Sequence, residues 1–320
     1  PSLRRDFEEH VAGQLDALDV IEKAVARHVH ILNPRKPLLL HFSGPTGVGK
    51  SLIANRIAES YFRDRNSQRL LCGKMLVHMR SYAGATGQQV HTVANKLLQD
   101  LARQLYHCPM SIIVLDEVQS VPEEILQHVL DVFDNSDPRL WDEQKKSSVN
   151  ANQAMIIFIS DLGHTRLAPD LTRLEAREMI QEEAAKRWKH VKRGVLLSNI
   201  VPFLPLSPEE LVRVANIELL QLRHRLFVEF KEWHGKLTWN KDIPSFIGSH
   251  CANNTYCSED GGRGVETFFE QEVVSLVEEV MLSLLRDSSH SFDNVRLYLA
   301  GGAVRAKLDS VYSSSEFSRN

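Results

Sequence analysis

The segment that most constrains the fold of this chain is a complete phosphate-loop pattern of eight residues. It comprises Gly44, Pro45, Thr46, Gly47, Val48, Gly49, Lys50 and Ser51. The pattern follows a short apolar run at residues 38–42 and opens a stretch with helical periodicity, which is the context that supports this motif. Glycines let main-chain N–H groups turn toward an anion, and the N-terminus of the next helix adds partial positive charge. The segment therefore predicts a strand, a phosphate-binding loop and a helix, in that order.

Two side chains of this loop are expected to supply charge and metal coordination. Lys50 is placed to reach the β- and γ-phosphate oxygens of ATP, and the Ser51 hydroxyl to bind Mg²⁺. The alternative is a glycine-rich turn that only resembles a phosphate loop, and the flanking strand and helix patterns disfavour it. ATP and Mg²⁺ are thus the expected cofactors.

A second apolar run, residues 112–115, ends in two carboxylates, Asp116 and Glu117. Ligands of open α/β sheets bind at the carboxyl ends of the strands, so these side chains are expected beside the phosphate loop. Asp116 is predicted to hold Mg²⁺, usually through water, and Glu117 to polarise the attacking water. An apolar run ending in Asp-Glu is common by itself, and its position downstream of a phosphate loop makes it specific.

Apolar runs alternate with amphipathic stretches through the first two thirds of the chain. This alternation predicts an α/β fold, a P-loop αβα sandwich with a parallel sheet. The expected strands lie near residues 38–42, 71–79, 111–115 and 154–160, and the expected helices near residues 3–32, 51–62, 88–105 and 123–133.

The pattern changes after Leu206, where the chain becomes mainly helical. Ser207 is a good helix N-cap, followed by Pro208 at the first helical position and Glu210 at the third. We therefore expect a nucleotide-binding domain over residues 1–206 and a smaller helical domain over residues 207–320. The second domain is expected to hold helices near 208–231 and 264–286, a polar loop near 240–262, a strand near 295–299 and a mobile Ser-rich tail.

The net charge of −3 and the pI of about 6.6 provide no basic field for nucleic acid, so no nucleic-acid partner is expected. One local basic cluster is interpreted as a solvated helix face: Lys186, Arg187, Lys189, Lys192 and Arg193. No apolar run is long enough to span a bilayer. The sequence begins at Pro1 without an initiator Met, so a targeting segment is expected to have been removed.

The four cysteines do not form two paired Cys-x-x-Cys units, which disfavours a structural zinc site. Cys251 and Cys257 are close enough in sequence to join in an oxidising compartment. Two free thiols in a loop are an equally good interpretation, and the sequence leaves both open.

A third apolar strand, residues 156–160, ends in Ser160-Asp161-Leu162-Gly163. Together with the phosphate loop, the Asp-Glu strand and a helical second domain, it resembles AAA+ ATPases of the Clp/HSP100 branch. Their sensor-1 strand usually ends in Ser-Asn-x-Gly, so the resemblance places Asp161 at the sensor-1 position. An anion beside the γ-phosphate is repulsive unless Mg²⁺ or a donor compensates it, which leaves efficient hydrolysis open. The alternative is that Asp161 caps the next helix.

Within that branch the chain is most similar to the torsins. The similar segments are residues 11–14, 33–38, 201–206 and 260–265, of which the Pro-Phe-Leu-Pro junction is the most specific. The resemblance implies that Gly13 and Gln14 lie near the adenine and that Arg263 is the sensor-2 cation. A surface arginine at a helix start is the alternative for Arg263. Torsins usually carry Trp and Asn where this chain has Pro45 and Ser51, and Cys where it has Gly262.

Clp-type relatives carry an arginine finger a few residues before the interdomain junction, and the resemblance matches that position to the uncharged Leu196. Arg193, three residues earlier, is the alternative candidate for the finger. The resemblance to torsins implies an activator protein that supplies the arginine, a protein client, and a homo- or hetero-oligomer. It also implies the endoplasmic reticulum lumen or nuclear envelope, with the cytoplasm as the alternative. Tyr82 is a candidate substrate-threading residue, which a Clp-type homo-hexameric unfoldase would need. A nucleotide-binding scaffold that does not hydrolyse ATP is the third hypothesis.

Overall fold

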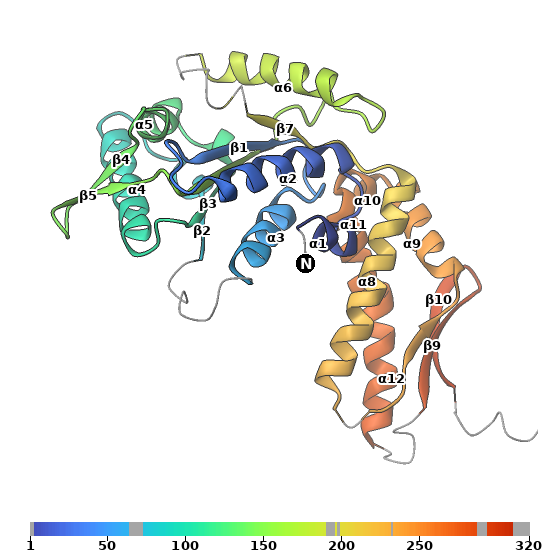
Figure 1. Ribbon diagram of the computed structural model, residues 1–320. Coiled ribbons are helices and arrows are strands. Elements are labelled where there is room, and N and C mark those ends of the chain that lie inside the picture. The colour runs from blue at the N-terminus through green and yellow to red at the C-terminus, as the bar shows by residue number, and fades with distance from the viewer. Residues whose placement is uncertain are drawn as a thin grey trace, which may run out of the picture. The chain divides into compact units, whose positions relative to one another are not determined.

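The computed structural model describes residues 3–63, 73–189, 196, 199–231, 233–286 and 293–309. The chain forms two compact units, Pro1–Pro205 and Leu206–Asn320, and each is described by itself (Figure 1). The predicted fold class is confirmed, because the first unit is built on a parallel sheet and the second is largely helical.

The sheet of the first unit has five strands in the order β2-β3-β6-β1-β7, and every neighbouring pair is parallel. Their bounds are β1 Leu38–Ser43, β2 Lys74–His78, β3 Ile112–Asp116, β6 Met155–Ser160 and β7 Ile200–Pro202. All six residues of β6 are buried, as expected for a central strand covered on both faces.

Helices cover both faces of this sheet, and alternate strand residues meet different helices. Ile157 and Ile159 pack into a core with the helices α1 Leu3–His10, α2 Leu15–His30 and α3 Lys50–Arg63. Ile156 and Phe158 pack into the other core, with the helices α4 Gln88–His107, α5 Glu123–Phe133 and α6 Arg173–Arg187. The alternation follows from the two-residue period of a strand.

Several features of the first unit differ from the sequence-based prediction, among them the unpredicted strand β7. The single helix expected over residues 3–32 is broken between α1 and α2, because Gly13 and Gln14 both adopt positive φ, 69° and 59°. A hairpin of two short strands, β4 Arg139–Asp142 and β5 Ser147–Asn150, was not predicted. Each strand has only four residues, too few for a clear alternating pattern.

The second unit combines helices with a small sheet. Its helices are α8 Pro208–Glu229, α9 Asp242–Asn253, α10 Thr255–Glu259, α11 Gly261–Phe269 and α12 Ser275–Arg286, with a π-helical turn over Glu270–Val274. The predicted capping box of Ser207 and Glu210 starts α8. The sheet order is β10-β9-β8, with bounds β8 Leu237–Trp239, β9 Asn294–Ala300 and β10 Ala303–Asp309.

The prediction of a polar loop over residues 240–262 was wrong, since α9 and α10 occupy most of it. Ile243, Ile247 and Cys251 of α9 are fully buried at four-residue spacing, a helical signal that the surrounding polar residues obscured. The predicted Ser-rich tail lies outside the described residues, and strand β10, which pairs with β9 in antiparallel fashion along its whole length, was not predicted.

Across the described ranges, no helix combines the length and the apolarity that crossing a membrane demands.

Candidate nucleotide-binding site

The phosphate loop connects the carboxyl end of β1 to the start of α3, as the sequence predicts. A side chain on Gly44 would place its Cβ 2.1 Å from the main-chain oxygen of Phe203, so only glycine allows this close approach. Gly49 has φ of 93°, and no atom lies within 4 Å of where its Cβ would be. The loop thus carries the backbone conformation and the open space that phosphate oxygens require.

Lys50 is buried, with 8% of its surface exposed, and its ammonium turns back onto the loop. Nζ donates a hydrogen bond to the Gly44 carbonyl oxygen at 2.6 Å and another to the Pro45 carbonyl oxygen. Ser51 lies in the first turn of α3 and is exposed. A triphosphate would offer Lys50 stronger acceptors than neutral carbonyls, so the geometry fits this ligand.

Asp116 and Glu117 follow the buried part of β3. Asp116 is largely buried, and its Oδ2 lies 3.9 Å from Nδ1 of His78 at the end of β2. Glu117 has φ of 60°, which turns the chain sharply before a short 3₁₀ helix, Val118–Ser120. Its Oε2 forms an ion pair at 2.8 Å with Nε of Arg80. Arg80, in the 3₁₀ helix Met79–Tyr82, was not among the residues selected from the sequence.

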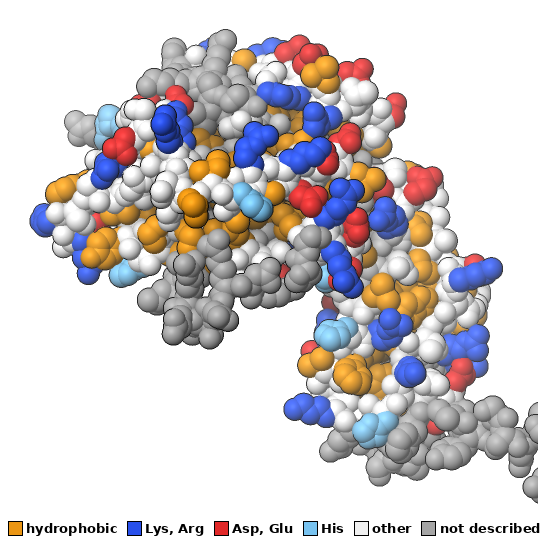
Figure 2. Space-filling model, in the orientation of Figure 1, with side chains coloured by type: hydrophobic (Ala, Val, Ile, Leu, Met, Phe, Trp, Pro, Cys, Tyr) orange, Lys and Arg blue, Asp and Glu red, His pale blue; other side chains and the backbone are white. Residues whose placement is uncertain are grey.

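The order of the strands brings these groups together at the carboxyl end of the sheet. Strand β6 lies between β3 and β1, with Leu115 opposite Phe158 and Ser43 opposite Ser160. The strands are parallel, so Asp116, Asp161 and the phosphate loop all emerge at their carboxyl ends. A different hollow, of about 380 Å³, is lined by the first residues of β1 and parts of α2 and α6, and so lies at the opposite end of the strands. Basic and apolar side chains gather over α2 and α6 on that face (Figure 2).

Asp161 directly follows β6 and is half-buried. The alternative hypothesis, that it caps the next helix, is wrong, because Thr172 caps α6 in a capping box with Glu175. The turn after Asp161 is held by its own main chain and by Glu183, whose Oε2 accepts a hydrogen bond from the Gly163 amide at 2.8 Å.

Gly13 and Gln14 form the turn between α1 and α2, and both are buried. The Gln14 side chain makes two hydrogen bonds to the main chain of Leu204: its Nε2 donates to the carbonyl oxygen at 2.7 Å, and its Oε1 accepts from the amide at 3.1 Å. The amide group therefore joins the start of the chain to the junction segment. Its predicted position near the adenine stays a prediction.

Other candidate residues of the first unit fall in different surroundings. Leu196 is buried, with 1% of its surface exposed, while Arg193 and Lys192 lie outside the described residues. Tyr82 is half-buried against the hydrophobic core, and burial raises the pKa of its hydroxyl. Arg187 donates to the carbonyl oxygen of Gln119 at 3.1 Å, so this member of the basic cluster contacts the protein itself.

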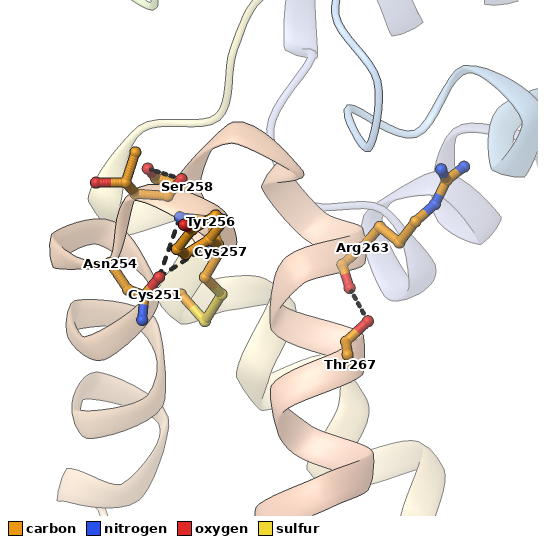
Figure 3. Close-up of a disulfide and its surroundings, with 8 residues drawn as sticks. Cys251, Asn254, Tyr256, Cys257, Ser258, Arg263 and Thr267 are labelled. Carbon is orange, nitrogen blue, oxygen red and sulfur yellow. Dashed lines mark hydrogen bonds between the residues drawn. A yellow bond between two sulfur atoms is a disulfide. The ribbon is translucent and has the colours of Figure 1, made fainter.

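Arg263 belongs to the second unit, where it is exposed in the first turn of α11. Cys251 and Cys257 form a disulfide between α9 and α10, so the interpretation as two free thiols is wrong. Figure 3 shows the Arg263 side chain extending away from this disulfide. Gly264 lets α11 approach α10 closely, since a Cβ there would lie 2.2 Å from the carbonyl oxygen of Cys257.

Comparison with known proteins gives two groups of matches. A family model described as Torsin matches residues 1–115. The chaperone protein ClpB of Chlamydia pneumoniae is 27% identical over 289 residues, which cover 88% of this chain and 32% of that protein. The Clp protease ATP-binding subunit ClpE of Streptococcus pneumoniae is 28% identical over 229 residues, covering 70% of this chain and 30% of that protein. The chain spans about a third of the length of these relatives.

Proposed function

This chain is a torsin-like AAA+ protein that is similar to the Clp chaperones. We propose that it binds ATP with Mg²⁺ and hydrolyses the ATP to remodel a protein partner. The resemblance predicted from the sequence is confirmed by these matches. The proposed reaction is supported by one observation. The phosphate loop, Asp116, Glu117 and Asp161 all follow the carboxyl ends of neighbouring parallel strands.

Each group at this end of the sheet has a chemical task. The loop amides and the Lys50 ammonium would bind triphosphate oxygens, and Ser51 and Asp116 would hold Mg²⁺. Bound Mg²⁺ would supply neutralising charge for the phosphates. Glu117 would accept a proton from the attacking water once its ion pair with Arg80 opens. Asp161 would orient that water or the metal's water ligands, and Gly13 and Gln14 would border the adenine.

A cation supplied by another protein would complete the site. Leu196 occupies the position expected for an arginine finger, and its side chain is buried. An arginine supplied in trans typically raises turnover by about 10³–10⁵-fold, so the isolated chain would be slow. We therefore propose an activator protein that supplies this arginine, within a homo- or hetero-oligomer, and no nucleic-acid partner.

The second unit would report the nucleotide state to the client. Arg263, exposed at the start of α11, would act as the sensor-2 cation toward the γ-phosphate. Its binding in the triphosphate state and release after hydrolysis would move the unit that carries it.

Two other functions each have one supporting observation. Similarity to ClpB and ClpE favours a homo-hexameric unfoldase that threads its client. Threading would depend on Tyr82, and the half-buried position of Tyr82 argues against this function. The Arg80–Glu117 ion pair favours a scaffold that binds nucleotide without hydrolysing it.

The endoplasmic reticulum lumen or nuclear envelope is the proposed compartment, and the cytoplasm is the alternative. The disulfide between Cys251 and Cys257 supports an oxidising compartment.

The proposal is tested by measuring nucleotide affinity and turnover with and without Mg²⁺. The measurements are made on the wild type and on Glu117→Gln. We expect Mg²⁺-dependent ATP binding in both proteins and phosphate release that is about 10²–10⁴-fold slower in the variant than in the wild type. Tyr82→Ala should leave this activity unchanged. Equal and negligible release from both proteins, also with an activator present, would establish the scaffold instead.

A further inference from the structure

A chain of buried polar side chains runs beneath the phosphate loop, and the proposed reaction does not use it. His41 and Ser43 come from β1, and Ser160 comes from the end of β6. Only 1%, 0% and 1% of their surfaces are exposed, respectively. Polar groups at this depth are costly unless they are hydrogen-bonded, so a chain of three in a strand core calls for a reason.

The three side chains contact one another and two main-chain oxygens. His41 Nδ1 lies 3.1 Å from the Leu196 oxygen, and Nε2 lies 2.8 Å from Ser160 Oγ. Ser43 Oγ lies 2.8 Å from Ser160 Oγ and 3.0 Å from the Leu162 oxygen, to which it donates. Ser160 and Leu162 are the residues on either side of Asp161.

Counting protons shows how these contacts are shared. The Leu196 oxygen only accepts, so His41 carries its proton on Nδ1. Burial lowers the pKa of His41 to about 4, with the hydrogen bond to Leu196 opposing and the charge of Lys50 adding to the effect. The ring is therefore neutral at pH 7, and Nε2 accepts the Ser160 proton. One proton, that of Ser43, is left for two acceptors, the Ser160 and Leu162 oxygens.

We propose that Ser43 and His41 are positioning residues for Asp161. The Ser43 hydroxyl contacts the Ser160 side chain on one side of Asp161 and the Leu162 main chain on the other, and it comes from the strand that leads directly into Gly44. His41 fixes the Ser160 hydroxyl and joins it to Leu196. The Ser43 proton thus adds to the backbone pairing of β1 with β6 in setting the spacing between Asp161 and the phosphate loop. This inference rests on the proposed function, because the position of Asp161 affects turnover only if the chain hydrolyses nucleotide.

The first test compares Ser43→Ala with a matched control, Ser111→Ala. Ser111 is also fully buried, donates to the Cys108 oxygen at 2.9 Å, and lies just before β3, outside this chain of contacts. We expect Ser43→Ala to lower kcat about tenfold with KM for Mg-ATP changed less than about twofold, because a misplaced Asp161 affects the reacting geometry and not ground-state binding. Equal kinetics of the two variants would overturn the proposal.

The second test needs no nucleotide. Amide hydrogen exchange is measured by NMR at Asp161, Leu162 and Gly163 in the same two variants. Ser43→Ala should speed exchange there about tenfold relative to Ser111→Ala, because the Leu162 oxygen loses its donor. Unchanged exchange would overturn the proposal. A wild type that neither binds nor hydrolyses ATP would refute the proposed function, and this second test would still decide the positioning role.

A third variant guards against a failure of Ser43→Ala to fold. His41→Phe removes the ring nitrogens that fix the Ser160 hydroxyl and join it to the Leu196 oxygen. We expect the same direction in kcat, with a combined effect of both substitutions smaller than the product of the single effects, because both act on one network. Independent, multiplicative effects of the two substitutions on kcat would contradict a shared hydrogen-bond network.

Discussion

Lys50 and Glu117, the two charged residues most closely tied to the proposed reaction, are held in different ways. The Lys50 ammonium bonds to carbonyl oxygens of its own loop, a few residues away in sequence. The Glu117 carboxylate pairs with Arg80, which belongs to a different segment and is 75% exposed. The group that binds phosphate is thus held by its local motif, whereas the group that activates water depends on a surface ion pair.

This difference has an energetic consequence. Solvent-exposed ion pairs contribute about 0–1 kcal/mol, so the Arg80–Glu117 pair is easy to open. Lys50 is buried, and removing it takes away the charge-assisted bonds that its ammonium would give to phosphate oxygens. Nucleotide binding should therefore depend strongly on one residue, and turnover should be adjustable by small changes around another.

Lys50→Ala should have the largest effect. Loss of charge-assisted hydrogen bonds worth about 1.5–3 kcal/mol each predicts Mg-ATP affinity lower by about a hundredfold. Isothermal titration calorimetry measures it. Lys36→Ala is the control, since Lys36 is an exposed lysine that donates to the Asp134 oxygen at 2.9 Å. Similar affinities of the two variants would show that the loop does not hold the phosphates.

Arg80→Gln should have a smaller effect in the opposite direction. Freeing Glu117 from an exposed ion pair predicts turnover about two- to fivefold faster, with nucleotide affinity unchanged. Phosphate release under saturating Mg-ATP measures it, and the double variant with Glu117→Gln should abolish the gain. Slower turnover in Arg80→Gln would mean that Arg80 assists the reaction and does not restrain it.

Glu218 of α8 offers a contrast to Glu117. It is a carboxylate whose burial is not offset by its nearby arginine. Burial, followed by the charges of Glu266 and Glu270, raises its pKa from 4.5 to about 7, with Arg225 opposing. A raised pKa in the folded state means that the stabilising contribution is complete below about pH 4.5. It is then lost as the pH rises to about 7.

Glu218→Gln should therefore be more stable than the wild type at pH 8, and this advantage should shrink at pH 5. Thermal unfolding at the two pH values, followed by circular dichroism, measures it. Glu229→Gln, at the exposed end of the same helix, serves as control. An equal Tm difference at both pH values would show that Glu218 does not titrate in this range.

The sequence predicts the phosphate loop, Asp116, Glu117 and the strand before Asp161, because each is a local pattern of apolar residues followed by a functional one. It does not predict the partners of these groups. Arg80 pairs with Glu117 from another strand end, and Gln14 bonds to a residue 190 positions away. Such contacts are set by the order of the strands in the sheet, which no local pattern contains.

His41 shows where a usable signal was present. It is a polar residue inside the apolar run that forms β1, and such a position in a buried strand requires partners. The second unit shows the opposite limit. Residues 240–262 are rich in polar and small side chains, so tertiary burial of three α9 residues outweighed the local preference for a loop.

The two hydrogen bonds between Gln14 and Leu204 protect backbone groups from pairing with a strand of another molecule. Strand β7 is the last in its sheet, and Leu204 lies just beyond it. At the edge of a sheet, an unpaired backbone amide and carbonyl can pair with a strand of another molecule, which promotes aggregation. The Gln14 side chain presents a donor and an acceptor in the way a neighbouring backbone would, and so occupies these two groups with a single residue.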